Sequence, residues 1–133
     1  MSSWDDVRRL ALSLPETSEQ DMHGLMSWRV KDKLFVWERP LRQSDLNALA
    51  VRGDDAPTGE IVGARVEHEG AKLALIESDP EVYFTIPHFD GYSAILALLE
   101  RIGLEELEEL ITEAWLLRAP KRVAAAYLAA RED

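Results

Sequence analysis

The stretch from residue 26 to residue 37 restricts the fold more than any other part of the chain. Apolar and polar side chains alternate over residues 26–30, which is typical of a strand that buries one face. The Lys-Asp-Lys sequence at 31–33 fits a tight turn, because aspartate tolerates the backbone angles that such turns require. The apolar run 34–37 then predicts a second, more deeply buried strand, which Pro40 ends. We therefore expect an antiparallel hairpin here.

The chain begins with a clear helix signal. Ser3 and Asp6 have the spacing of a capping box, in which each side chain bonds the backbone N–H of the other residue. Apolar side chains at positions 7, 10, 11 and 14 then recur at helical spacing, and Pro15 stops the helix. The polar run 16–24 that follows predicts a loop.

The rest of the chain mixes strands and helices. Its predicted elements are a short helix or irregular segment at 41–50 with Ser44 as a candidate cap, a loop at 53–59, a strand at 61–68, a helix at 71–77, a strand at 82–86, an amphipathic helix at 104–117 and a last helix from Pro120. Residues 94–102 fit a helix or a buried strand equally well. Most strand links are too short for parallel crossovers, so the pattern predicts an α+β fold with an antiparallel sheet.

Length and composition limit the class of protein. A chain of 133 residues with 47% hydrophobic side chains fits a single globular domain, residues 1–133. The absence of cysteine excludes disulfides, iron–sulfur clusters and thiolate zinc sites. The N-terminus does not look like a signal peptide and no apolar run approaches the ~20 residues that cross a bilayer, so we expect a cytoplasmic protein without a membrane partner. A net charge of −10 would repel DNA at long range unless the basic residues gather on one face.

Four stretches of the sequence resemble one family over essentially the whole chain. They are LALSLPETSE, SWRVKDKLFVW, DPEVYFTIPHFDGY and ITEAWLLRAPKRVAAAYL, and together they are similar to the MmcQ/YjbR-like family. The resemblance implies a leading helix, an antiparallel sheet and further helices packed on one face, a two-layer arrangement likened to the frataxin/CyaY fold. It also implies a strand at 94–102 and a DNA-binding role for a pair of β wings. It brings no catalytic residues.

DNA binding needs basic residues on one surface, and two groups are available. The hairpin region holds Arg29, Lys31, Lys33, Arg39 and Arg42, and the C-terminal region holds Arg118, Lys121 and Arg122. If both groups share a surface, the hairpin could enter a groove while the start of the last helix contacts phosphates. The alternative is that these are solvated charges on strand and helix edges. We expect any binding to be weak and salt-dependent.

The sequence argues against an enzyme. Nucleophilic catalysis needs a serine or cysteine beside a histidine that an acid orients, and the chain has no cysteine and no GxSxG motif. The histidines, His23, His68 and His88, match no metal-binding spacing. A site built from His23, His88 and Asp90 is geometrically conceivable, but no spacing supports it. We therefore expect no catalytic residues, no metal and no cofactor.

A ligand- or partner-binding role is the alternative to DNA binding, because the chain has many large rings. Its candidate surface comprises Trp28, His88, Phe89, Asp90 and Tyr92, most of them in the segment 85–92. We expect Trp37, Phe84 and Trp115 in the core. Phe89 and Tyr92 flank the turn-forming pair at 90–91, and could fold inward or face a small molecule or a protein. Glutamates at 105, 106, 108 and 109 are interpreted as the solvated face of their helix.

Overall fold

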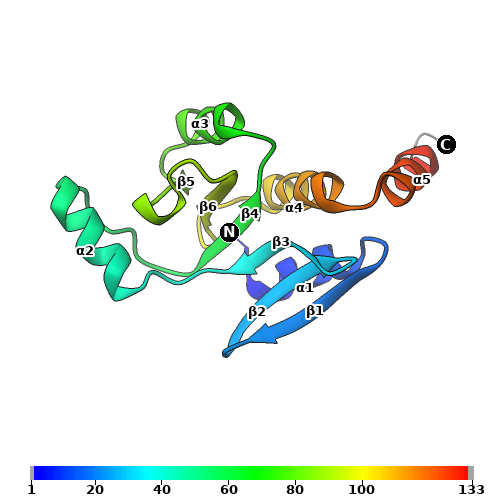
Figure 1. Cartoon of the computed structure of the whole chain (residues 1–133), viewed down its shortest axis with the longest axis horizontal. Coiled ribbons are helices and arrows are strands. Elements are labelled where there is room, and N and C mark those ends of the chain that lie inside the picture. The colour runs from blue at the N-terminus through cyan, green and yellow to red at the C-terminus, as the bar shows by residue number, and fades with distance from the viewer. Residues whose placement is uncertain (1, 132–133) are drawn as a thin grey trace.

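The computed structural model describes residues 2–131 as an α+β fold around one antiparallel sheet (Figure 1). The strands are β1 (Thr17–Met22), β2 (Leu25–Val30), β3 (Lys33–Glu38), β4 (Ile61–Arg65), β5 (Tyr83–Phe84) and β6 (Ala94–Leu98), in the spatial order β1-β2-β3-β4-β6-β5. The helical elements are α1 (Trp4–Leu12), α2 (Gln43–Arg52), α3 (Glu69–Ser78), the 3₁₀ turn η1 (Pro87–Phe89), α4 (Leu104–Arg118) and α5 (Lys121–Arg131). None of the helices within residues 2–131 has the length and apolar character needed to cross a lipid bilayer. The predicted fold class is confirmed.

Helices α1 and α4 cover one face of the sheet and bury the larger of two cores. The apolar stripe of α4, with Leu107, Ile111 and Trp115, joins Phe35 of β3 in this first core. The Trp115 ring is fully buried, and its Nε1–H donates to the Pro15 carbonyl oxygen at 3.0 Å. This bond satisfies the polar group of the ring, which makes its burial favourable. The prediction that Trp115 lies in the core is confirmed.

The opposite face of the sheet carries a second, smaller core, which α2 and η1 cover. Successive residues of a strand point to opposite faces, so Val36 faces the first core and Trp37 lies here beside Leu49 of α2 and Phe89 of η1. Phe35 joins Val36 in the first core because the register between β2 and β3 shifts at this point. Gly63 of β4 makes room for the Trp37 ring, since a Cβ atom at this position would lie 2.6 Å from the indole. Trp37 is a core residue as predicted, whereas Phe84 is only half-buried at the margin of this core. The resemblance implied helices on one face of the sheet. The structure has that layer and also places α2 on the opposite face.

The predicted hairpin is present as β2, β3 and their turn. Trp28 of β2 pairs with Val36 of β3. Lys31 and Asp32 adopt positive φ angles of 49° and 67°, as a two-residue hairpin turn requires. The expectation that Asp32 accepts unusual backbone angles is confirmed.

The prediction of a loop at 16–24 is wrong, because Thr17–Met22 form β1. This strand lies at the edge of the sheet and pairs with β2 alone, with Thr17 opposite Val30. Its side chains are mostly exposed, so its sequence shows no apolar alternation. Polar edge strands are common because they discourage pairing with other chains.

Other elements differ from the prediction in detail, including β4, which ends at Arg65 and not at residue 68. Asp45, rather than Ser44, caps the start of α2, because its carboxylate accepts the Arg42 N–H at 2.8 Å. The strand predicted at 82–86 shrinks to two residues, because the chain then turns into η1. The ambiguous residues 94–102 begin with β6, as the resemblance implied.

Candidate functional site

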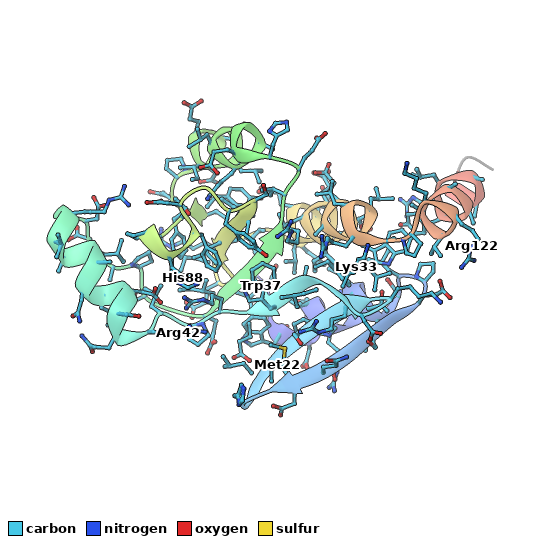
Figure 2. The ribbon with its side chains drawn as sticks, in the orientation of Figure 1. Met22, Lys33, Trp37, Arg42, His88 and Arg122 are labelled. Atoms are coloured by element: carbon cyan, nitrogen blue, oxygen red, sulfur yellow. The ribbon has the colours of Figure 1, made fainter. Side chains whose placement is uncertain are left out.

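An open cleft of about 470 Å³ lies over the second core. Its walls come from three parts of the chain that are distant in sequence: the β1–β2 turn, the start of α2 and the segment 85–92 (Figure 2). Strands β2 and β3 contribute the surface between these walls. The lining includes Met22, His23, Met26, Ser27, Trp37, Glu38, Arg39, Arg42, His88, Phe89 and Tyr92. The cleft therefore unites two sets of residues that the sequence had suggested for different functions.

Aromatic rings form a connected group along one wall of the cleft. Phe89 is 7% exposed and contacts both Trp37 and Tyr92, with centroid distances of 6.3 and 5.8 Å. His88 meets the Phe89 ring edge-on at 4.9 Å. Tyr92 is 45% exposed, with Phe89 stacked against its ring and the Arg65 guanidinium over the ring at 4.7 Å from the centroid. The two rings whose orientation the sequence left open thus differ: Phe89 is core and Tyr92 is surface.

A buried lysine fixes the shape of the segment 85–92. Lys72 of α3 is fully buried, and its Nζ donates to the carbonyl oxygens of Phe89 at 2.7 Å and Tyr92 at 3.0 Å. The Glu69 carboxylate lies 3.5 Å from the same nitrogen and balances its charge. Gly91 has a φ of 77°, which lets the chain bend between the two carbonyls at no steric cost. Because a buried ammonium is costly unless it is paired, these contacts hold the aromatic wall in one conformation.

A buried ion pair supports the opposite wall. Arg39 Nη1 lies 3.0 Å from Asp45 Oδ2, and both side chains are almost completely buried. Burial opposes the ionisation of Asp45, but the Arg42 N–H and the Arg39 guanidinium outweigh it and hold the pKa of Asp45 below its ordinary value. The same guanidinium lies over the Phe89 ring, 5.4 Å from its centroid. The pair therefore ties the start of α2 to the aromatic wall.

One end of the cleft is basic. Arg42 is exposed at the N-terminus of α2, where the helix dipole adds positive potential. Figure 2 shows His88 and Arg42 at the end of the molecule that carries α2. Arg39 Nη2 is buried and has no hydrogen-bond partner within residues 2–131. Glu38, which also lines the cleft, is half-buried and accepts the Met26 N–H at 3.1 Å. A ligand with a negatively charged group fits this end best.

The hairpin group of basic residues is largely engaged within the protein. Arg39 is buried in its ion pair. Lys31 Nζ lies 3.1 Å from a glutamate carboxylate, and Arg29 is half-buried. Lys33 and Arg42 are exposed. Burial and pairing thus remove part of the positive charge that DNA contact would use.

The structure separates part of the hairpin group of basic residues from the C-terminal group. Figure 2 shows Arg42 at one end of the molecule and Arg122 at the opposite end with α5, while Lys33 lies on the side of Arg122. Lys121 and Arg122 are exposed, and Arg118 is half-buried. Arg42 therefore lies apart from the C-terminal group, whereas Lys33 lies nearer to it.

Trp28 is not part of a partner surface, and this part of the prediction is wrong. The ring is 2% exposed, stacks on Trp4 at 6.2 Å and donates its Nε1–H to a glutamate at 3.0 Å. It belongs to the first core because the alternation of β2 sends it to that face. Asp90 is exposed but lies outside the cleft lining, 3.7 Å from Arg52.

The histidines do not assemble a catalytic set with Asp90. His23 and His88 both line the cleft, but Asp90 faces away toward another arginine. The Ser27 hydroxyl is buried and donates to the Gln20 carbonyl oxygen at 3.2 Å, so it is not presented as a nucleophile. Within residues 2–131 no three histidine or acidic side chains gather closely enough to hold a metal ion.

Sequence reasoning missed several residues that shape the cleft. The carbonyl partners of Lys72 lie 17 and 20 residues away, so no local pattern indicates its role. Met22 and His23 fell in a segment that was predicted as a loop. Arg42 and Asp45 have the spacing of a capping box, but arginine cannot accept the N–H bond that this motif needs, so the sequence contains no clear signal for Asp45.

Comparison with known proteins places this architecture in a family. The YjbR family model matches residues 12–117, a range that contains the whole sheet and every cleft residue named above. The chain belongs to the YjbR family. The family that the sequence resemblance indicated is therefore confirmed.

Relatives of the chain agree with this family and fold. Uncharacterised proteins of Mycobacterium tuberculosis strain H37Rv and Mycobacterium bovis are each 56% identical over 129 residues, which covers 97% of this chain and 98% of each relative. A crystal structure of a Deinococcus radiodurans protein with a DUF419 domain matches with a TM-score of 0.66. That match has 17% sequence identity and covers 92% of this chain and 82% of the other, and it shows a shared fold.

Proposed function

We propose that this YjbR-family chain is a binding protein without catalytic activity, and that the cleft beside the segment 85–92 takes a small, planar ligand. The observation that carries the proposal is the exposed Tyr92 ring, stacked at 5.8 Å on buried Phe89 at the margin of the cleft. A rigid exposed ring binds flat apolar surfaces with little loss of conformational entropy. A volume of about 470 Å³ also lies in the range of small-molecule sites.

The ligand should carry an acidic group. Arg42 and the N-terminus of α2 supply positive potential at one end of the cleft, and His88 lies at the same end of the molecule. An acidic group placed there would leave the apolar body of the ligand against Trp37 and Tyr92.

A dye titration tests this function. Anilinonaphthalene sulfonate is an aromatic anion with a planar naphthalene ring system, and its fluorescence rises when it leaves water, so it models the proposed ligand. We expect saturable binding to the native protein, and an affinity about tenfold weaker in Tyr92→Ala and in Arg42→Glu, because each removes one of the two recognised features.

Matched controls come from the far end of the molecule. Leu128 on α5 is 47% exposed, close to the value for Tyr92, and Arg122 is an exposed arginine like Arg42. Leu128→Ala and Arg122→Glu should bind the dye with native affinity. The same affinity in all five proteins would contradict the proposal.

DNA binding is the second candidate, and it is favoured by the exposed Lys33 and Arg122 on the same side of the molecule (Figure 2). Such contact would be weak, and its affinity would fall steeply with salt because it rests on phosphates. Fluorescence anisotropy with a labelled duplex at low salt measures it. Loss of binding in Lys33→Glu and Arg122→Glu, with native binding in Arg42→Glu, would support this candidate. No binding at about tens of micromolar, which lies inside the typical range of non-specific affinity, would contradict it.

A further inference from the structure

A second hollow lies on the other side of the sheet, between α3 and α4. Its volume is about 590 Å³, and among the described residues it shares no lining residue with the cleft. Apolar side chains of the two helices form its floor: Ala71, Ala74, Leu75, Leu110 and Leu117. Several of these pack against or belong to the first core, so the floor continues into the interior. We call this hollow the α3–α4 groove.

The floor of the groove is incompletely covered by the chain itself. The fully buried residue of α3 is Lys72, which turns toward the segment 85–92. The apolar side chains of α3 that line the groove are consequently half-buried or exposed: Ala71 and Leu75 are half-buried and Ala74 is exposed. Leu117 on the facing helix is 44% exposed. Exposed apolar side chains beside a hollow indicate a surface that a partner can cover.

Carboxylates dominate the rim of the groove. The acidic lining residues are Glu67, Glu106, Glu109 and Glu113. Three of them follow α4 at spacings of three and four residues, so they form one line about 10 Å long. Within the described lining Arg65 is the basic residue, and its guanidinium is engaged over the Tyr92 ring at 4.7 Å. The rim therefore presents a row of negative charge beside an apolar floor.

The properties of Tyr83 reflect this negative potential. Its hydroxyl donates to Glu106 Oε2 at 3.2 Å. Burial raises the pKa of Tyr83, and the carboxylates of Glu106, Asp79 and Glu109 raise it further. The same field disfavours nucleic acid and acidic peptides in the groove and favours a cationic partner.

We propose that the α3–α4 groove docks a basic, amphipathic α-helix of a partner protein. Leucine-like side chains of that helix fill the apolar floor, and lysines or arginines at positions i, i+3 or i+4, and i+7 reach Glu106, Glu109 and Glu113. Laying an amphipathic helix into an apolar groove is a common mode of recognition. The row of opposite charges fixes the orientation of the helix and speeds its association. This interaction does not depend on the ligand of the cleft.

The direct test uses synthetic peptides and isothermal titration calorimetry with the full chain at about 0.15 M salt, where non-specific attraction is screened. The probe is a leucine–lysine peptide of about 16 residues with its leucines on one helical face. A second peptide has the same composition in an order that destroys that face, and a third replaces every lysine with glutamate. We expect binding of the first peptide alone. No binding of the first peptide, or equal binding of the first two, would overturn the proposal.

Charge reversals on α4 locate the binding surface. The double variant Glu109→Lys/Glu113→Lys reverses the charge at two positions of the rim. The double variant Glu105→Lys/Glu108→Lys makes the same change of net charge at exposed positions outside the groove. The first double variant should lower the affinity by about tenfold or more, and the second by less than about threefold. Equal losses would show that only net charge matters and would overturn the proposal.

An uncharged pair of variants tests the apolar floor. Leu117→Ser removes an exposed floor residue, and Leu128→Ser removes a side chain of similar exposure on α5. Only Leu117→Ser should lower the affinity for the leucine–lysine peptide, by about fivefold. Native melting temperatures would establish that both proteins are folded. An unchanged affinity in Leu117→Ser would contradict docking on this floor.

Discussion

The cleft and the α3–α4 groove lie on opposite faces of one sheet and are built from opposite chemistry. Rings line the cleft, and its exposed end is basic. Aliphatic side chains line the groove, and its rim is acidic. The division follows from strand geometry, because neighbours such as Val36 and Trp37 point to different faces and enter different cores. A net charge of −10 therefore describes neither surface by itself.

The two surfaces also differ in what their charges do. Around the cleft, Lys72 and the pair of Arg39 and Asp45 are buried, and they hold backbone and walls in place. At the groove, Glu109 and Glu113 are exposed on a helix. Substitution of the buried charges around the cleft should thus cost stability, whereas substitution of the exposed glutamates of the groove should cost only partner affinity.

The largest effect is expected from Asp45→Ala. This variant leaves the Arg39 guanidinium buried without its carboxylate, which typically costs about 3–5 kcal/mol of unfolding free energy. Glu109→Ala on the groove rim should change stability by less than about 0.5 kcal/mol. Urea unfolding of both proteins measures the difference. Equal stabilities would mean that the buried pair does not support the cleft.

Lys72→Met should be the next most damaging change. It keeps the length of the side chain but removes the donor to the Phe89 and Tyr92 carbonyl oxygens, at a cost of about 2–3 kcal/mol. Amide hydrogen exchange should rise in the segment 85–92, and dye affinity should fall with it. Native exchange rates in that segment would show that Lys72 does not hold it in one conformation.

Gly63→Ala should destabilise the protein by about 1–2 kcal/mol, because the new Cβ lies 2.6 Å from the Trp37 ring and forces it to move. The cleft should also lose dye affinity, while peptide binding in the groove stays native. Gly103→Ser is the control, since its Cβ meets nothing within 4 Å and serine suits the start of α4. Melting curves of both variants and titrations with the dye and the peptide measure these effects. Equal melting temperatures and dye affinities in the two variants would contradict the prediction.

The smallest predicted effect is on pH dependence. The pKa of Asp45 is lowered in the folded protein, so its charge contributes stability above the unfolded-state pKa of about 3.9. That contribution is lost as the pH falls through the folded-state pKa. Between neutral pH and about pH 3, the melting temperature of Asp45→Asn should therefore fall by less than that of the native protein. The same fall in melting temperature in both proteins would contradict a lowered pKa of Asp45 in the folded state.

The sequence predicted those parts of the fold that depend on local patterns. The hairpin and α4 follow from alternation and helical spacing, and the cap at Ser3 follows from its capping box. β1 was missed because an edge strand needs no apolar face, and β6 was assigned only through the family resemblance. Alternation also indicated that Trp28 is buried, so its place in a partner surface conflicted with its own strand.

The candidate site was less predictable, because it depends on contacts between distant residues. The sequence singled out Tyr92, His88 and Arg42 but divided them between two functions. No pattern along the chain could show that α2 and the segment 85–92 meet across one face of the sheet. The glutamates of α4 were interpreted as a solvated face, and only the position of α3 shows that some of them border a groove.

The most direct test of the cleft is the indole region of a ¹H–¹⁵N spectrum during titration with anilinonaphthalene sulfonate. The chain has four tryptophans, and Trp37 lines the cleft. The indoles of Trp4, Trp28 and Trp115 are held elsewhere by hydrogen bonds. We predict that the Trp37 signal shifts progressively while the other three stay in place. A Trp37 signal that does not move while the dye binds would contradict the cleft as the ligand site.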